Sequence, residues 1–493
     1  MLTACLLAAM IVGQTPDSVY KQAALDLAER VPPDKRRITR YLSLHAVPEN
    51  QRAEFTRILT FALNSTSFRG QFVKPLSLAG TPLLRIDLES LGWDRDSRIA
   101  RRARLAQSGV KFAFQDAAAE NQFLDPWEGF AAADVYWKVS QVTAGYHSRG
   151  WLDPVVEEST RKLSSSSNLL LRADWLLPKL LTEKEQGGFY SSLLMFPADE
   201  TSLYKLFGVD IAFVDRENQL KQGGAVLESV VALHNRELQQ IPSLFGYDER
   251  FIWRTFDFAV DDVGAKSVLE SFAGTVKHDG REIIGSLPNG LHWYYLADAA
   301  GKQVAVVPQA IALDMRTDNF GAIKDRNVIN AYKCISCHGP VSGTYPFDDV
   351  VGKAIVTPEI ALAVIAKDKQ KVADRQQAIE EYYLSDLGKK IARQQESYGA
   401  RVKACNGVEP GPNSEQLVAW IDRYLWGLVS LEQAAREMGR DVTAAVGLLR
   451  ASGNPQLIVL SAGQPIRRAA FEKAWADAMR AVVYPWENAK GAY

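Results

Sequence analysis

The residues best suited to chemistry lie close together in AYKCISCHGP, at positions 331 to 340. Cys334, Cys337 and His338 form the pattern C-x-x-C-H, in which a pair of thiols precedes an imidazole. Such a pattern can attach haem c, because the thiols reach the vinyl groups of one porphyrin edge while the adjacent imidazole binds the iron. The sequence therefore predicts one covalent haem c at Cys334 and Cys337, with His338 as the proximal iron ligand.

Two other chemistries use paired cysteines. A structural zinc site needs four protein ligands, and no second close Cys or His pair exists to supply them, so only Cys405 or a scattered histidine could complete the set. A thioredoxin-like dithiol is expected beside a βαβ unit, whereas a β-rich pattern and the polar segment RNVINAYK precede this motif. Both alternatives stay open, and haem c is the favoured interpretation.

The ligand on the other side of the iron is a separate question. We select His278 as the candidate, because it lies in a polar His-Asp-Gly turn from which an imidazole could face a haem. A structural turn histidine, or an open sixth position, is the alternative. The weaker candidates are Met315 in a polar loop, Met438 on an apolar helix face, Met479, His234 in a predicted helix, His292 in a predicted strand, His45 and His147.

The first residues, MLTACLLAAMIVG, form an apolar stretch of the length of a signal-peptide core, too short to span a bilayer. We predict that residues 1–13 are a signal peptide and that the protein is periplasmic or otherwise exported, as haem c attachment requires. LTAC, at positions 2–5, also resembles a lipoprotein cleavage box, so lipid anchoring at Cys5 is the less favoured alternative. No later segment is apolar for the roughly 18 residues of a membrane helix, which predicts no transmembrane span in the mature chain.

Composition limits the partners. The chain has 493 residues, a formal net charge of −1 and 47% hydrophobic residues, as expected of a globular protein with several domains. The basic run at 94–107 alternates with acidic and apolar residues, which predicts a solvated helix face and no nucleic-acid partner. A redox partner protein is expected, of unknown identity.

The surrounding patterns predict an α+β fold. Residues 48–63 have the apolar spacing of an amphipathic helix, and Leu84, Ile86 and Leu88 alternate with charged residues as in a half-buried strand. Three β-prone runs, at 281–287, 291–298 and 303–308, are separated by turn residues and predict an antiparallel meander, with Asn289 and Gly290 supplying positive φ angles.

Beyond about residue 352 the pattern becomes helical. Ser430 and Gln433 have the spacing of a capping box, Gly439 suits a helix end, and Asp441 can cap a following helix through Leu449. The predicted domains are an N-terminal α+β region at 14–182, a haem c domain at 183–351 that contains the meander, and a helical C-terminal region at 352–493, with a linker near 406–413.

Three segments in order carry a resemblance: HNRELQQIPSLFGYDERFIWRTFDF, KHDGREIIGSLPNGLHWYYLADAAGKQV and CISCHGP. They resemble an uncharacterised group of exported monohaem c-type cytochrome proteins best known from planctomycete-like bacteria. The resemblance covers about 208 to 345, and the helix around SLEQAAREMG is similar to the tail of longer members. It implies haem attachment at Cys334 and Cys337, ligation by His338 and an electron-transfer role, and it supplies no substrate.

Three functions follow from these features. The first is an exported electron-transfer protein in which one covalent haem c carries one electron. The second is a haem enzyme, for instance peroxidase-like, with an open sixth position, although no catalytic constellation stands out in the sequence. The third is a redox sensor or docking module in which the haem reports to a bound partner.

Overall fold

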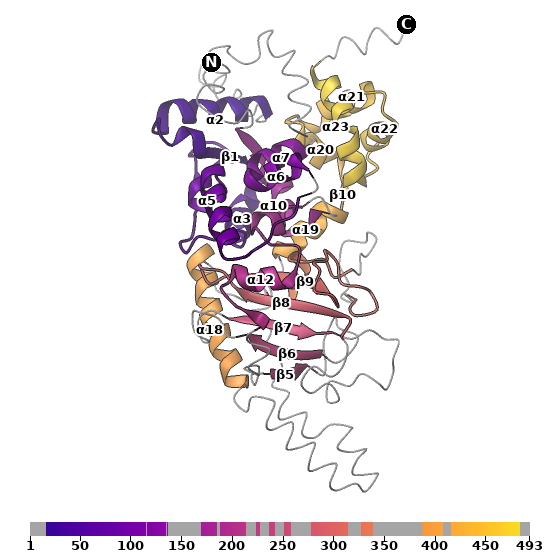
Figure 1. Ribbon diagram of the computed structural model, residues 1–493. Helices are drawn as coiled ribbons and strands as arrows, with labels where there is room; N and C mark the ends of the chain where they lie inside the picture. The colour runs from indigo at the N-terminus through magenta and orange to yellow at the C-terminus, as the bar shows by residue number, and fades with distance from the viewer. Residues whose placement is uncertain are drawn as a thin grey trace, which may run out of the picture.

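The computed structural model describes residues 16–114, 116–134, 136, 169–184, 188–212, 223–226, 236–241, 251–257, 278–313, 327–338, 387–407 and 416–483. The predicted signal peptide, with Cys5, lies outside these residues. The fold is α+β, as predicted, with an N-terminal sheet and its helices, a five-stranded antiparallel sheet and a helical C-terminal region (Figure 1). Within the described ranges, no helix is both long and apolar enough to cross a membrane.

The N-terminal sheet has the strand order β2-β3-β1-β4. Its strands are β1 (Thr39–Ser43), β2 (Leu76–Ser77), β3 (Leu83–Asp87) and β4 (Leu170–Arg172). Every residue of β1 is buried, and β1 pairs antiparallel to β3 and parallel to β4. The helices of this part of the chain are α2 (Pro16–Arg30), α3 (Arg52–Asn64), α4 (Leu88–Leu91), α5 (Arg95–Gln107), α6 (Ala117–Leu124), α7 (Pro126–Ala133), α10 (Ala173–Leu181), α11 (Tyr190–Leu193) and α12 (Glu200–Leu206).

Two of the predicted N-terminal elements are confirmed. The helix expected at 48–63 is α3, entered through a short 3-10 turn at Glu49–Gln51, and its predicted apolar stripe is buried. In β3 the apolar side chains of Leu84 and Ile86 are buried while the charged ones between them are half-buried. The strand stops one residue earlier than predicted, because the Asp87 carboxylate accepts a hydrogen bond from the Ser90 N–H and starts α4 at Leu88.

The helix expected at 94–107 is α5, but its prediction as a solvated face is wrong at one residue. Arg98 is 1% exposed, and its guanidinium donates hydrogen bonds to the carbonyl groups of Phe123, Leu193 and Ser192, at 2.7, 2.9 and 2.6 Å. Burial lowers the pKa of Arg98 to about 9. A cation in the interior is tolerated here because backbone oxygens replace its lost water.

The five-stranded sheet has the order β5-β6-β7-β8-β9, and every neighbouring pair is antiparallel. Its strands are β5 (Gly223–Val226), β6 (Arg236–Ile241), β7 (Ile252–Phe256), β8 (Gly280–Ser286) and β9 (His292–Asp298). Strands β8 and β9 are the first two runs of the predicted meander and pair from Gly280↔Asp298 to Ser286↔His292. The helix predicted around His234 is wrong at both ends, where β5 and β6 lie; His234 itself is outside the described residues.

Two details of the predicted meander differ. The run at 303–308 forms isolated bridges at Gln303 and Val306 instead of a third strand. In the turn before β9, Gly290 has a φ of +86°, whereas Asn289 does not adopt a positive φ. Asn289 instead donates from its side-chain amide to the carbonyl of Asn64, at 2.9 Å, so this residue joins the hairpin to α3.

The C-terminal region is helical, as predicted, with one two-stranded ribbon. Ser430 and Asp441 cap their helices by accepting N–H groups from Gln433 and Ala444, and Gly439 has a φ of +62°, as the capping pattern predicts. The elements are α18 (Leu387–Asn406), α19 (Gln416–Trp426), β10 (Leu428–Val429), α20 (Leu431–Glu437), α21 (Val442–Ala451), α22 (Pro455–Ser461), β11 (Ile466–Arg467) and α23 (Arg468–Val483).

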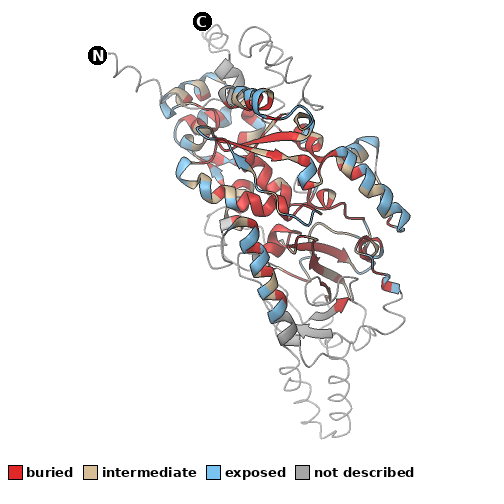
Figure 2. Ribbon diagram, turned by 90° about the vertical axis from the view of Figure 1, so that its left-hand side faces the viewer, coloured by how far each residue is buried: buried red, intermediate tan, exposed pale blue. Residues whose placement is uncertain are grey.

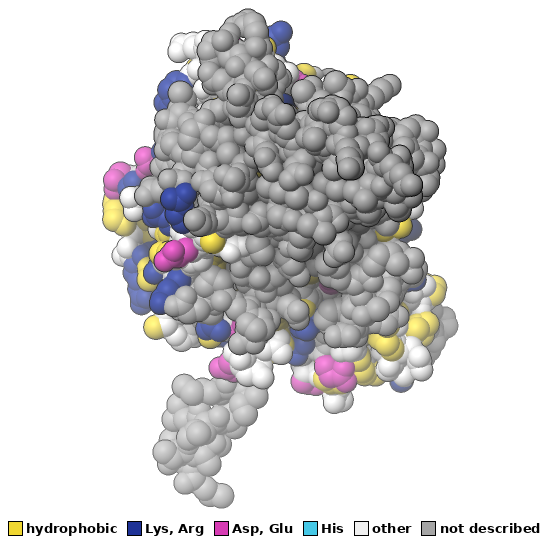
Figure 3. Space-filling view, turned by 90° about the horizontal axis from the view of Figure 1, so that it is seen from below, with side chains coloured by type: hydrophobic (Ala, Val, Ile, Leu, Met, Phe, Trp, Pro, Cys, Tyr) yellow, Lys and Arg dark blue, Asp and Glu magenta, His cyan; other side chains and the backbone are white. Residues whose placement is uncertain are grey.

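One hydrophobic cluster runs through all three predicted regions, and Figure 2 shows its buried residues from the N-terminal sheet to the five-stranded sheet. Helix α18 packs along α3, and α19 packs on α10, so C-terminal helices complete the core of N-terminal elements. The domain boundaries at 182 and 351 stay a prediction. On the described part of the face seen in Figure 3, basic side chains lie among acidic and apolar ones.

Candidate functional site

The C-x-x-C-H motif lies on one short helix, α14 (Tyr332–His338). Cys334 and His338 are four residues apart and so lie on the same side of the helix. Cys334 is buried, with 3% exposure, while His338 is half-buried. Cys337 belongs to the same helix, although the position of its side chain is outside the described part. The structure thus places Cys334 and His338 on one side of the same helix, and their role in holding a haem stays a prediction.

The backbone immediately before α14 is strained. Ala331 has a φ of +66° and is fully buried, whereas residues with a side chain rarely adopt this left-handed conformation. The conformation costs a non-glycine residue about 1 to 2 kcal/mol. Such strain concentrates at functional sites, where surrounding contacts hold the chain in place.

Two groups on β9 hold the C-terminal end of α14. The Nδ1 atom of His292 lies 3.0 Å from the carbonyl oxygen of His338, and the Tyr294 hydroxyl donates to the same oxygen at 3.1 Å. Burial lowers the pKa of His292 to about 3, so the ring is neutral. Because a carbonyl only accepts, Nδ1 carries the proton of this neutral ring. The expectation that His292 is a packed, hydrogen-bonded side chain agrees with these contacts.

Further contacts fix α14 and His292 from the C-terminal helices. The imidazole of His292 stacks on the ring of Tyr398 in α18, with 3.6 Å between centroids and 11° between planes. Lys333 of α14 lies 3.7 Å from Asp422 of α19. The motif helix α14 therefore lies between β9 of the five-stranded sheet and helices α18 and α19, which follow it in the chain.

The first cysteine has its own polar neighbours, which the sequence did not reveal. The Cys334 thiol donates a weak S–H···O bond to the Asn330 side-chain oxygen, at 3.9 Å. The Asn330 Nδ2 group donates to Glu183 Oε1, at 2.7 Å, and both residues are buried. In the sequence, Asn330 belongs to the polar segment RNVINAYK, whose pattern indicates no particular role. Glu183 is too distant in the chain for any local pattern to relate it to the motif.

The candidate sixth ligand lies elsewhere. His278 precedes the Gly280 end of β8, whereas His338 contacts β9 at His292, which pairs with Ser286 at the other end of the hairpin. At about 3.4 Å per residue, these ends are about 20 Å apart. His278 packs against Phe256, and burial together with Arg281 and Arg254 lowers its pKa to about 4. The structure does not bring His278 to the motif.

Two of the remaining sequence candidates are described: Met438 is buried in the hydrophobic core, and His45 belongs to a separate polar cluster. Met315, His147, His234 and the side chain of Met479 lie outside the described residues. Cys405 contacts the carbonyl of Thr60, and burial raises its thiol pKa to about 12. Among the described residues, no set of three His, Cys, Asp or Glu side chains is arranged to hold a metal ion.

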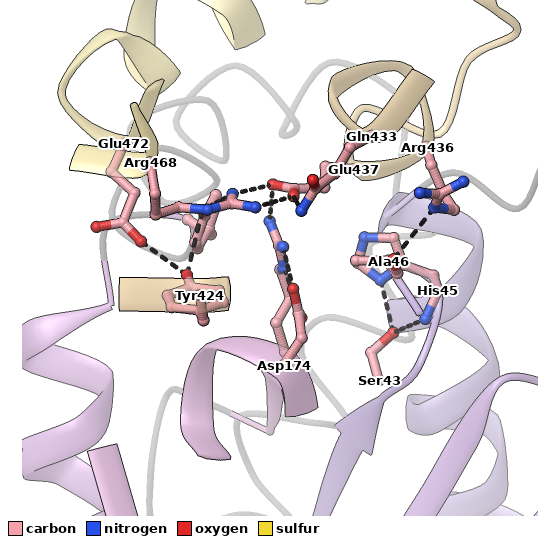
Figure 4. Close-up of polar contacts among 12 residues, drawn as sticks. Ser43, His45, Ala46, Asp174, Tyr424, Gln433, Arg436, Glu437, Arg468 and Glu472 are labelled. Atoms are coloured by element: carbon pink, nitrogen blue, oxygen red, sulfur yellow. Dashed lines mark hydrogen bonds and ion pairs between the residues drawn. The ribbon is translucent and has the colours of Figure 1, made fainter. Parts of the chain in front are cut away.

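A second polar cluster lies in the interior, between the N-terminal elements and the C-terminal helices (Figure 4). The Glu437 carboxylate accepts a hydrogen bond from Arg172 at 2.9 Å and two from Arg468 at 2.7 and 2.8 Å. Arg172 also donates to Asp174. Burial opposes the ionisation of Glu437, but the two guanidinium groups outweigh it and lower the pKa of Glu437 to about 2. Two carboxylates and two guanidinium groups balance one another in charge, so this cluster is a structural tie.

The donors on α14 are of the chemical kinds that haem c attachment uses, a thiol and an imidazole. They lie on one side of the helix, the thiol buried near Tyr190 and Tyr294 and the imidazole half-buried. Comparison with known protein families, with characterised proteins and with solved structures finds no match to this chain.

Proposed function

We propose that this protein is an exported monohaem c-type cytochrome that transfers single electrons. The observation that carries the proposal is the C-x-x-C-H motif on α14, with Cys334 and His338 on one side of the helix. Cys334 and Cys337 would hold the haem by thioether bonds, and His338 would be its proximal iron ligand. When bound, the haem would supply a one-electron couple whose potential depends on axial ligands and burial.

The residues around α14 support this role through rigidity. His292 and Tyr294 bind the carbonyl of His338, and Lys333 is tied to Asp422, so both the end and the outer side of the helix are fixed. These contacts hold the backbone from which the His338 imidazole extends. The resemblance to monohaem proteins of planctomycete-like bacteria and an export signal at 1–13 are consistent parts of the proposal.

The direct test is the spectrum of the full-length protein, produced in cells that attach haem c outside the cytoplasm. We expect a haem c spectrum in alkaline pyridine and a haem that acidic acetone does not extract. The Cys334→Ala/Cys337→Ala double variant should lose covalent haem, while Cys405→Ala, which removes a buried thiol on α18, should keep it. Extractable haem, or no haem at all, in the wild-type protein would refute the proposal.

The same sample separates an electron carrier from a haem enzyme. His278 precedes one end of the hairpin and His338 contacts the other end, about 20 Å away, so His278 is not proposed as the sixth ligand. A six-coordinate carrier should resist carbon monoxide when reduced, whereas prompt carbon monoxide binding would favour the peroxidase-like alternative. Haem-dependent capture of one partner, lost in Cys334→Ala, would favour the sensor alternative.

A further inference from the structure

We propose that Asn330 and Glu183 are positioning residues that orient the Cys334 thiol for thioether formation. The inference rests on the proposed function and concerns how the first cysteine is prepared. Its basis is a buried chain of two hydrogen bonds. The Nδ2 group of Asn330 donates to Glu183, and the side-chain oxygen of Asn330 accepts a hydrogen bond from the Cys334 thiol.

Glu183, at 2.7 Å, and the carbonyl of Tyr294, at 3.4 Å, determine which way the Asn330 amide points, and Glu183 makes the shorter contact. A carboxylate accepts hydrogen bonds and donates none, so the Nδ2 group of Asn330 must face it. The oxygen of the amide is then directed at Cys334. Glu183 is itself fixed by the Ser191 hydroxyl, which donates to it at 2.6 Å, and Ser191 in turn accepts the side-chain amide of Gln303.

The backbone contributes to the same geometry. Asn330 is fully buried and its N–H group donates to the carbonyl of Ala305, at 2.9 Å. Ala331 follows in the left-handed conformation. The Ile335 N–H group donates to the carbonyl of Ala331, at 2.7 Å, in the first turn of α14. The strained turn thus lets the side chain of Asn330 face the first turn of the helix, where Cys334 lies.

Thioether formation adds the thiol across a vinyl double bond. The S–H bond breaks, a bond forms between sulfur and one vinyl carbon, and the proton goes to the other vinyl carbon, so no oxidant is consumed. The bond from the thiol to Asn330 exists only before this step, because the product sulfur carries no proton. Asn330 and Glu183 should therefore affect how often Cys334 is joined, and should leave the spectrum of fully attached protein unchanged.

The experiment counts thioether bonds in full-length protein. Mass spectrometry of haem peptides gives the ratio of doubly to singly attached haem, and the pyridine spectrum of Cys334→Ala gives the single-thioether reference. We expect Asn330→Ala to lower the ratio about two- to fivefold, the factor that one weak S–H···O bond supplies. Asn327→Ala is the matched control, because this nearby residue binds Gln309 at the surface.

The Glu183 variants test the same chain without changing Asn330. Glu183→Met should lower the ratio, and Glu183→Gln should restore it, because the amide oxygen still accepts Asn330. These variants decide the question if Asn330→Ala does not fold. A wild-type ratio in folded Asn330→Ala or Glu183→Met would overturn the inference, and a general loss of haem at an unchanged ratio would indicate a structural role alone. Absence of covalent haem from the wild-type protein would instead refute the proposed function.

Discussion

Arg172 and Glu437 are 265 residues apart in the chain and bind each other in the interior, with 2.9 Å between Nη1 and Oε2. Arg468 donates to both oxygens of the same carboxylate, so one buried anion joins β4 to both α20 and α23. Removing one member of such a cluster leaves charges in a medium that solvates them poorly.

Glu437→Gln should therefore lower the free energy of unfolding by about 3 to 5 kcal/mol, because it leaves two buried guanidinium groups without their shared anion. Urea unfolding measures the loss. Glu89→Gln is the control, since Glu89 pairs with Lys35 at the surface and its removal should have no measurable effect. Equal effects of the two substitutions would contradict the assigned role of Glu437.

The same cluster predicts an acid-sensitive step. Burial, followed by the charge of Arg172, lowers the pKa of His45 from 6.5 to about 4, and Asp174 and Glu437 only partly offset this shift. The unfolded chain then binds a proton that the folded chain does not, so stability falls as the pH drops from about 6.5 toward 4.

Between about pH 7 and pH 5, the neutral His45 should lower the free energy of unfolding by about 2 kcal/mol. The variant His45→Gln, which cannot titrate, should lack this decrease. The measurement is urea unfolding at the two pH values. His278 and His292, whose pKa values are also lowered by burial, should keep a residual dependence in the variant. An unchanged pH slope in folded His45→Gln would refute the prediction.

Arg98 should be intolerant of lysine. Its planar guanidinium reaches three backbone oxygens, which a single ammonium group cannot satisfy with the same geometry. Arg98→Lys should cost about 2 kcal/mol or more in thermal or urea unfolding. The exposed Arg104 of the same helix is the matched control, and Arg104→Lys should change stability by less than about 0.5 kcal/mol.

The two donors on the His338 carbonyl should be coupled. Tyr294→Phe alone should lower the free energy of unfolding by about 1 kcal/mol, because His292 still donates to the His338 carbonyl. Combining it with His292→Gln should cost more than the sum of the single variants, by about 0.5 kcal/mol or more. A double-mutant cycle of unfolding free energies gives this term and cancels the separate loss of stacking on Tyr398. Strict additivity would show that the two donors act independently.

Local patterns predicted the local structure well. The apolar stripe of α3, the turn before β9 and the caps at Ser430 and Asp441 each depend on residues a few positions apart, and the structure contains all of them. The α+β fold follows from the same patterns.

Long-range contacts were outside the reach of such patterns. Arg98 lies in a run that resembles any solvated helix, and its burial depends on carbonyl groups from two other segments. The tie between Glu183 and Asn330 spans 147 residues. Sequence also placed His278 within reach of the motif, because position along the chain does not reveal which end of a hairpin a residue occupies.

The contact between Arg172 and Glu437 also constrains the order in which parts of the chain can complete their folding. Synthesis proceeds from the N-terminus, so β4, with Arg172 and its neighbour Asp174, is made long before Glu437. Until α20 is made, Asp174 is the counter-ion available to Arg172, and the buried cluster lacks its central carboxylate. The N-terminal sheet thus depends on the last helices of the chain for its charge balance, so the two ends of the chain should unfold in one cooperative step.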